Sequence, residues 1–232
     1  MLNNFESLTN LQNLDVIILN QRKKITQKNE EIRKIQQDLE TKNSEWENYR
    51  KLYDQERIEL SRLELELKDV EEKLKKSQSQ LYSGAVQSGK ELSQWKSTME
   101  NYEKTKSNLE DYVINQIDKI EGMKIKEKEK EHQLLIQRFE KNIENLKNDI
   151  EKLQTDLANN LLLRADATQI IPAEILALYE ELRKKFPDPV VPMDGDTCQG
   201  CHLALPSSIA KRVRKKEEII QCPNCQRLIF YK

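Results

Sequence analysis

The chain has 232 residues, of which 34% are charged and 6% aromatic, and its formal net charge is −1. An apolar fraction of 37% is low for one compact globule of this length, and the low glycine and proline counts do not indicate disorder. No stretch approaches the ~20 apolar residues that span a bilayer, so we expect no membrane insertion.

A long helix is the first predicted element. No proline occurs before Pro172, so that kind of helix breaker is absent from the first 171 residues. Every seventh residue from Leu11 is apolar, and this regularity over ten heptads predicts a coiled coil: Leu11, Ile18, Ile25, Ile32, Leu39, Trp46, Tyr53, Leu60, Leu67, Leu74 and Leu81. An intermediate heptad row, which steps by seven from Leu14, is apolar in only half of its positions.

The segment SGAVQSGKEL, residues 83–92, interrupts the heptads. Gly84, Gly89 and Lys90 match the spacing of a phosphate-binding loop, G-x-x-x-x-G-K. Such a loop requires Ser or Thr after the lysine and a buried strand before it, whereas this chain has Glu91 and a charged, helical-looking segment. We therefore interpret Gly84, Gly89, Lys90 and Glu91 as a hairpin tip, at which glycines allow the chain to reverse.

Two helical arms of similar length flank this tip, which favours one chain folded into an antiparallel hairpin. A parallel dimer of long uninterrupted helices is the competing interpretation. The return arm has two runs of apolar heptad positions: the first ends at Met123 and the second starts at Ile136. The second run is out of phase with the first. The charged segment 124–133 between them predicts a register break beside Gly122, and a continuous helix with a stutter is the alternative. In this segment His132 is expected to face solvent.

From Pro172 the pattern changes. Residues 172–186 predict a short amphipathic helix with Pro172 in its first turn, and Pro187, Pro189 and Pro192 predict an extended linker. We expect three regions: a coiled-coil hairpin at 1–165 with its tip near 83–90, a helix and linker at 166–192, and a small module at 193–232. In that module, residues 218–221 and 228–231 are predicted strands.

Four cysteines form two C-x-x-C pairs, Cys198 with Cys201 and Cys222 with Cys225. Two such pairs place four thiolates around one ion, which predicts a single structural Zn²⁺. An iron site of the same geometry or a redox pair remains the alternative. His202 follows Cys201, but four thiolates already satisfy a tetrahedral ion. With paired cysteines and a polar N-terminus that lacks an export signal, we expect a cytoplasmic protein.

Between the cysteine pairs lies a basic insert: Lys211, Arg212, Arg214, Lys215 and Lys216. From Cys198 onward, seven basic and two acidic residues give this segment a charge of +5. Such a patch could contact the phosphates of RNA or DNA. It could equally be a solvated surface that balances the acidic remainder, because only Phe230 and Tyr231 are candidates for stacking on bases.

These segments resemble the bacterial C4-type zinc-ribbon proteins with an N-terminal coiled-coil hairpin. The resemblance rests on LYSGAVQSGKELSQW at the tip, SNLEDYV, ALYEELRKKF, and the ribbon TCQGCHLALP and IIQCPNCQRLIFY. Gln226 stands where the family commonly has glycine after the last cysteine. The resemblance implies an adaptor or chaperone of flagellar or type III secretion systems that contacts secretion components and the enhancer-dependent sigma factor, with RNA binding also reported in the family.

The sequence therefore predicts a mainly α protein, a long antiparallel coiled-coil hairpin followed by a small C-terminal zinc ribbon. We expect a non-enzymatic, zinc-binding adaptor that docks protein partners, present as a monomer or a dimer. A nucleic-acid-binding regulator that uses the basic insert is the alternative function. An enzyme ranks last, because a four-thiolate ion has no open position and the chain offers no usable phosphate-binding loop.

Overall fold

The computed structural model describes residues 2–83, 88–216 and 219–231. Helix α1 runs from Leu2 to Tyr82, α2 from Gly89 to Gly122, and α3 from Ile125 to Gln169. The chain divides into two compact units, residues 34–142 and residues 1–33 with 143–232. Each unit contains part of α1 and part of the returning helices.

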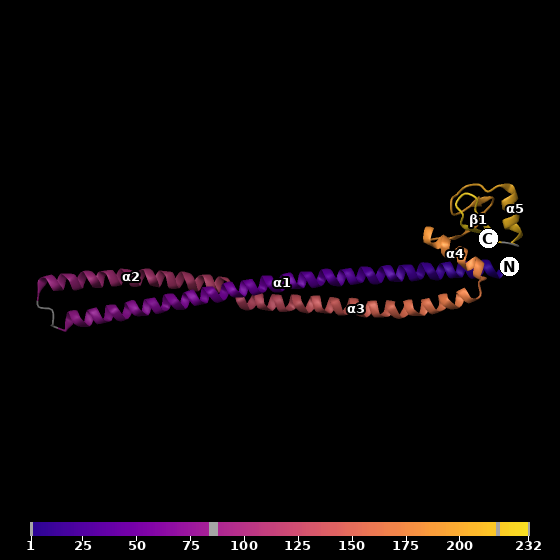
Figure 1. Ribbon diagram of the computed structural model, residues 1–232. Coiled ribbons are helices and arrows are strands. Elements are labelled where there is room, and N and C mark those ends of the chain that lie inside the picture. The colour runs from indigo at the N-terminus through magenta and orange to yellow at the C-terminus, as the bar shows by residue number, and fades with distance from the viewer. Residues whose placement is uncertain (1, 84–87, 217–218, 232) are drawn as a thin grey trace. The chain divides into compact units, whose positions relative to one another are not determined.

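In the unit of residues 34–142, α1 pairs with α2 and the first turns of α3 in an antiparallel hairpin (Figure 1). The contacts fix the direction of the pairing: Lys106 Nζ lies 3.0 Å from a Glu71 carboxylate oxygen, and Lys119 Nζ lies 2.7 Å from Glu56. The earlier residue of α1 thus pairs with the later residue of α2, which is the antiparallel pattern. The predicted hairpin is confirmed, and the parallel dimer of uninterrupted helices is wrong.

The return helix begins as the tip sequence suggests. Ser88 precedes α2, and its hydroxyl oxygen accepts a hydrogen bond from the backbone N–H of Glu91 at 3.3 Å, so it acts as the N-cap. Gly89, Lys90 and Glu91 form the first turn, where a carboxylate is favourable beside the positive end of the helix dipole. Gly84 and residues 85–87 of the predicted tip lie outside the described residues.

All eleven positions of the unbroken heptad row are buried or half-buried in α1. Several polar residues of the intermediate row have polar partners on the returning helices, among them Gln21, Lys28 and Glu56. Gln116 donates to the backbone carbonyl and the carboxylate of Glu56 at 2.9 and 2.7 Å. Because a buried polar group must find its partner, these positions fix the register of the two helices.

The predicted break beside Gly122 is confirmed. Helix α2 ends at Gly122 and α3 begins at Ile125, and Lys124 between them has a positive φ of 49°. The Tyr49 hydroxyl donates to the free carbonyl of Met123. His132 does not face solvent as expected: its ring is half-buried and stacks on Trp46, with centroids 5.3 Å apart. Aromatic rings from α1 therefore fill the space beside the break.

In the other unit, a four-stranded sheet has the order β2-β1-β4-β3. Its strands are β1 at Val190–Asp194, β2 at Thr197–Cys198, β3 at Ile220–Gln221 and β4 at Leu228–Tyr231. β1 and β4 are parallel, and the other pairs are antiparallel. The strands predicted near 218–221 and 228–231 are present, with residue 218 outside the described residues.

Strand β1 arises from the segment expected to be an extended linker. Pro192 lies inside β1 opposite Phe230, which is possible because β2 pairs with β1 only from Met193 onward. A proline lacks the N–H that a second neighbouring strand would need at that position. The division of the chain at residues 165 and 192 remains a prediction, and contacts cross both positions.

The two faces of this sheet pack on different partners. Val191 and Ile229 face the cysteines and helix α5, Ser207–Lys215. Val190 and Leu228 face the other way, onto a cluster built from α4, Ala173–Lys185, and from Leu8 and Leu11 at the start of α1. Residues at opposite ends of the sequence therefore complete one core.

Asp15 links the helices of this core. Its carboxylate is 5% exposed and accepts hydrogen bonds from Arg164 Nε of α3 at 2.6 Å and from the Tyr179 hydroxyl of α4 at 2.7 Å. Arg183 Nη2 of α4 lies 2.9 Å from the same carboxylate. Burial, and then the bond to Asp15, raise the pKa of Tyr179 well above its usual value, so the phenol remains a donor.

We predict that Asp15→Asn loosens this unit, because the amide leaves Arg164 and Arg183 without their buried counter-charge. Losing one member of such a network costs about 2 kcal/mol. Backbone amides of α4 should then exchange with deuterium roughly 30-fold faster. Asp149→Asn is the control, because the exposed Lys28–Asp149 pair contributes little. Equal exchange in the two variants would contradict the prediction.

Candidate metal centre

Each cysteine pair lies in a tight turn next to a strand. In the first turn, the N–H of His202 donates to the Cys198 carbonyl at 2.8 Å, and in the second the N–H of Gln226 donates to the Cys222 carbonyl at 2.9 Å. His202 and Gln226 both have positive φ, 59° and 68°. The two turns are thus built alike, and each directs its two thiols to the same side.

The four sulfur atoms converge on one point. All four Sγ atoms lie within 4.8 Å of one another, with Cys198 and Cys225 at 3.9 Å and Cys201 and Cys222 at 3.8 Å. A tetrahedral zinc ion with Zn–S bonds of about 2.3 Å needs sulfur atoms about 3.8 Å apart. The donor set therefore fits one structural Zn²⁺, as the cysteine spacing predicts. His202 is exposed and does not belong to this group.

The protein environment acts differently on the individual thiols. Burial raises the pKa of Cys198 to about 12 and also raises the pKa of Cys222. Burial acts in the same direction on Cys225, but hydrogen bonds from the Arg227 backbone, from Cys222 and from the Arg227 side chain lower its pKa overall. Zinc binds thiolates, so the bound ion replaces these protons and stabilises the folded ribbon.

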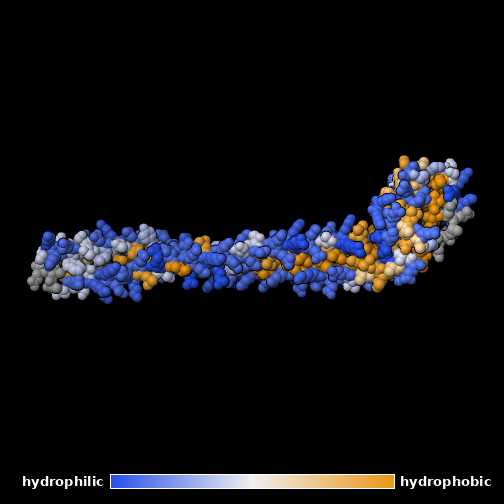
Figure 2. All heavy atoms as spheres, in the orientation of Figure 1, coloured by the Kyte–Doolittle hydropathy of each residue, from blue (hydrophilic) through white to orange (hydrophobic). Residues whose placement is uncertain are grey.

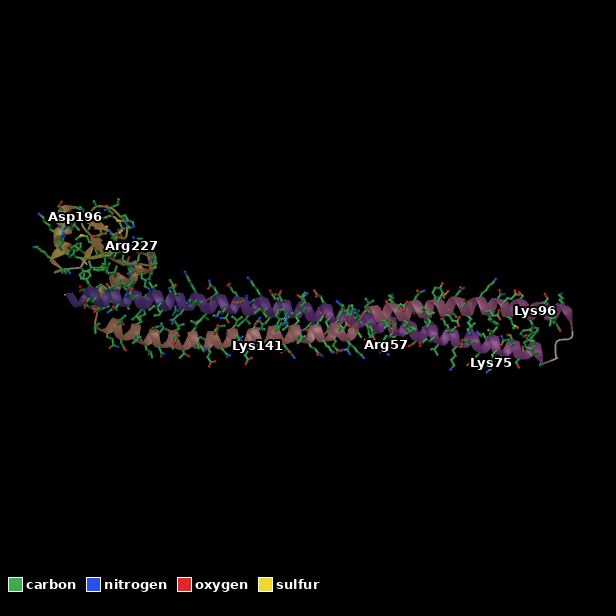
Figure 3. All side chains as sticks on the ribbon, turned by 180° about the vertical axis from the view of Figure 1, so that it is seen from behind. Arg57, Lys75, Lys96, Lys141, Asp196 and Arg227 are labelled. Atoms are coloured by element: carbon green, nitrogen blue, oxygen red, sulfur yellow. The ribbon has the colours of Figure 1, made fainter. Side chains whose placement is uncertain are left out.

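Arg227, labelled in Figure 3, connects the metal centre to its surroundings. Its Nη1 donates to the Gly200 carbonyl of the first turn at 2.8 Å, and its Nε and Nη2 donate to Asp188 at 3.1 and 2.9 Å. The guanidinium lies 4.2 Å above the centre of the Phe186 ring at the end of α4. The planar guanidinium thereby ties both turns to α4.

Gly200 leaves the space that Arg227 occupies. A Cβ at position 200 would lie 2.7 Å from Cδ of Arg227, closer than side-chain atoms approach. Neither Arg227 nor Gly200 is among the residues predicted from the sequence. Their place within the two cysteine motifs could have indicated them, but the contact between them could not be predicted, because it joins residues 27 positions apart.

The basic insert lies in the C-terminal half of helix α5 and at its C-cap, Lys216. Arg214 Nη2 lies 2.6 Å from Asp196, and Lys216 Nζ lies 5.5 Å from the centre of the Tyr231 ring. Lys211, Arg212 and Lys215 are exposed along the helix. Two of the five predicted residues, Arg214 and Lys216, thus have contacts within the ribbon.

Two family models match the chain. The CT398-like coiled coil hairpin domain matches residues 11–186, and the C4-type zinc ribbon domain matches residues 197–229. The chain belongs to the CT398-like hairpin family. Its ribbon match covers all four cysteines, and no curated protein matches the chain.

Solved structures show the same fold across nearly the whole chain. CT398 from Chlamydia trachomatis is 20% identical with a TM-score of 0.74, and the alignment covers 99% of this chain and 98% of that one. A Mycobacterium smegmatis protein is 13% identical with a TM-score of 0.79, covering 100% and 99%. The HP0958 protein from Helicobacter pylori is 20% identical with a TM-score of 0.50, covering 99% and 98%.

We predict that Cys222→Ser abolishes stoichiometric zinc binding and unfolds the ribbon, because three thiolates hold the ion poorly and the small core depends on it. Helical circular dichroism should stay nearly unchanged, since the long helices have their own packing. His202→Asn is the matched control: asparagine tolerates positive φ, and this variant should retain one zinc per chain. Undiminished zinc in Cys222→Ser would refute the four-cysteine assignment.

Gln226→Gly should tighten the second turn. A non-glycine residue at a φ of 68° is strained, and relief of that strain exceeds the added chain entropy by about 0.5–1 kcal/mol. Zinc affinity in competition with a chelator should rise roughly two- to fivefold. Gln199→Gly removes the same side chain where φ is not positive, so its zinc affinity should fall. Equal effects in both variants would argue against strain at Gln226.

Proposed function

We propose that the protein is a non-enzymatic, chaperone-like adaptor of the cytoplasm that docks protein partners through its coiled-coil hairpin and its zinc ribbon. Four thiolates fill every position of a tetrahedral ion, so the metal would stabilise the ribbon rather than bind a substrate or water. Among the described residues, no helix is long and apolar enough to cross a membrane.

A groove between α1 and α2 carries this proposal. Its volume is about 490 Å³, and its floor is formed by Leu63 and Leu109, which are 8% and 9% exposed. Tyr112 is 60% exposed at its edge, and Glu59 and Arg62 lie along its rim. An apolar floor with an exposed aromatic side chain and a charged rim suits an amphipathic helix of a protein partner.

The partners we propose are flagellar or type III secretion components and the enhancer-dependent sigma factor. This choice rests on the family resemblance of the tip and ribbon motifs. The groove supports a peptide or helix as the bound element, and it gives no preference among these proteins.

Nucleic-acid binding through α5 is the second candidate. Lys211, Arg212 and Lys215 present positive charge on one short helix. Against it, the two aromatic residues available for stacking have contacts within the protein: Phe230 packs on Phe5 with centroids 6.2 Å apart, and Tyr231 lies under Lys216. Basic residues in the last turn of α5 also favour the helix itself, because they face the negative end of its dipole.

Binding to the purified sigma factor and secretion components tests the proposal. Tyr112→Ala should weaken binding roughly tenfold or more, since exposed aromatic residues dominate such interfaces. Ile114→Ala is the matched control, because Ile114 is similarly exposed at 57% on the same helix and does not line the groove.

The paired substitution Lys211→Glu with Lys215→Glu separates the two candidate functions. It should leave protein binding unchanged under the adaptor proposal, and it should abolish RNA retention at low salt if nucleic acid is the ligand. An adaptor that binds none of the proposed partners, or one whose partner is lost on nuclease treatment, would overturn the first proposal.

A further inference from the structure

A second groove, called the tip groove below, lies between α1 and α2 towards the tip of the hairpin. Its volume is about 850 Å³, and on α1 it is lined by Lys73, Lys76, Ser77 and Gln80. Each of these residues lies two heptads after a residue that lines the groove with Tyr112: Glu59, Arg62, Leu63 and Glu66. Equivalent heptad positions face the same way, so both grooves open on the same flank of α1. The side chains at these positions differ, and the two grooves therefore suit different partners.

The floor of the tip groove is a small polar residue, where the other groove has a leucine. Ser77 lies between the heptad residues Leu74 and Leu81 and is 5% exposed. Its hydroxyl donates to the backbone carbonyl of Lys73 at 2.9 Å, so it needs no partner across the groove. Because serine fills much less space than leucine, the helix pair has a hollow at this level.

Aromatic rings form the α2 side of the hollow. Trp95 and Tyr102 line the groove, and both are half-buried. Between them, the Thr98 hydroxyl donates to the backbone carbonyl of Gln94 at 2.9 Å, as the Ser77 hydroxyl does within α1. Small residues with satisfied hydroxyls and two partly exposed rings thus bound the hollow, which can accept an apolar side chain.

The tip end of the hairpin is basic, whereas the adjoining part of the two helices is acidic. Residues 73–106 contain seven lysines, three glutamates and no arginine, a charge of +4. Residues 56–72 have three basic and seven acidic residues, and residues 107–123 have one and four, so these segments have charges of −4 and −3. On the face visible in Figure 2, this end of the helix pair is mostly hydrophilic.

Positive charge beside the tip groove is not neutralised within the hairpin. Lys76 lines the groove, and Lys104 lies one heptad after the lining residue Ser97; both lysines are exposed. Neither has an ion-pair partner among the described residues, and Lys73 pairs with Asp69 of its own helix at 2.6 Å. By contrast, the arginine on the rim of the other groove pairs with two glutamates. A complementary occupant of the tip groove therefore carries negative charge.

The shape of the groove favours a protein helix over a nucleic acid. Its lining residues recur three or four positions apart, at 73, 77 and 80 on α1 and at 94, 98 and 102 on α2. A third helix inserts its side chains between residues with this spacing. Nucleic-acid sites commonly stack bases on exposed rings and use arginine for phosphates, whereas both rings here are half-buried and residues 73–106 contain no arginine.

We infer that the tip groove binds an acidic amphipathic helix of a partner protein. An apolar side chain of that helix enters the hollow over Ser77 beside Trp95, and its carboxylates lie beside Lys76 and Lys104. The inference rests on the proposed adaptor function, and it adds a second docking site whose partner is defined by charge. This site is separate from the groove with Tyr112, so either can fail without the other.

Binding of a synthetic peptide tests the inference. The probe is a helical peptide of about 20 residues with a leucine stripe flanked by glutamates, and its twin has glutamine in place of every glutamate. The full-length, zinc-loaded chain should bind the glutamate peptide at low salt and the glutamine peptide roughly tenfold more weakly. Fluorescence anisotropy of the labelled peptides measures both affinities.

Two pairs of variants locate the site. Lys76→Glu should weaken binding of the glutamate peptide roughly fivefold. Lys75→Glu is its control, because it makes the same charge change at an exposed neighbour, labelled in Figure 3, that does not line the groove. Ser77→Leu fills the hollow and should also weaken binding, although an aliphatic residue at this heptad position should raise the thermal stability of the hairpin. Ser79→Leu, at an exposed position outside the groove, should leave binding unchanged.

A chain that binds neither peptide, or both equally, would overturn the inference. So would equal losses in Lys76→Glu and Lys75→Glu, or binding that survives Ser77→Leu. Retention of a single-stranded uridine oligonucleotide instead of the peptide, lost in Lys76→Glu, would make nucleic acid the occupant. Tyr112→Ala should bind the acidic peptide as the wild-type chain does, so failure of the proposed function at that groove and failure at the tip groove are separate results.

Discussion

The buried carboxylate of Asp15 is the interaction on which the unit with the ribbon depends. A charge that is 5% exposed is tolerated only when it is paired, and Asp15 has the guanidinium groups of Arg164 and Arg183 and the hydroxyl of Tyr179 around it. These partners come from α3 and α4, so one side chain of α1 sets the positions of both. Gln12, one turn earlier, bonds both the N–H and the carbonyl of Val190 at 2.7 and 3.0 Å, which ties the same stretch of α1 to β1.

Zinc and Arg227 act on the other face of the sheet. The ion draws the two cysteine turns together, and Arg227 connects those turns to Asp188 and Phe186 beside α4. Because α4 also carries Tyr179 and Arg183, the metal centre and the Asp15 network meet in the same short helix. The ribbon is therefore stabilised from two sides, by metal–thiolate bonds on one face and by the start of α1 on the other.

In the hairpin, the register between the two arms has to be fixed although the long helices have few distinctive side chains. Aliphatic heptad positions alone allow one helix to slip along the other by a heptad. Polar core positions remove that freedom, as when Gln116 and Lys119 both meet Glu56, because a slipped register would leave them unpaired. Near the break at Lys124, aromatic side chains of α1 fix the register instead: Tyr49 contacts Met123 and Trp46 stacks on His132.

Features that depend on local spacing could be predicted from the sequence. A seven-residue repeat defines a helix face, two C-x-x-C pairs define four converging thiolates, and a glycine and a change of phase mark the end of α2. The sequence could not identify Asp15 among 40 acidic residues, because its burial is created by α4 more than 150 positions away. The expectation for His132 failed for the same reason, since its ring is covered by Trp46 from the other arm.

Strand β1 could not be predicted from its proline-containing segment, because its pairing strand β4 lies more than 30 residues further along the chain. The contacts of Arg214 with Asp196 and of Lys216 with Tyr231 were likewise beyond the reach of the sequence pattern. In each case the deciding contact joins residues far apart in sequence, whereas the pattern that could be read from the sequence repeats within a few turns of one helix or within one cysteine motif.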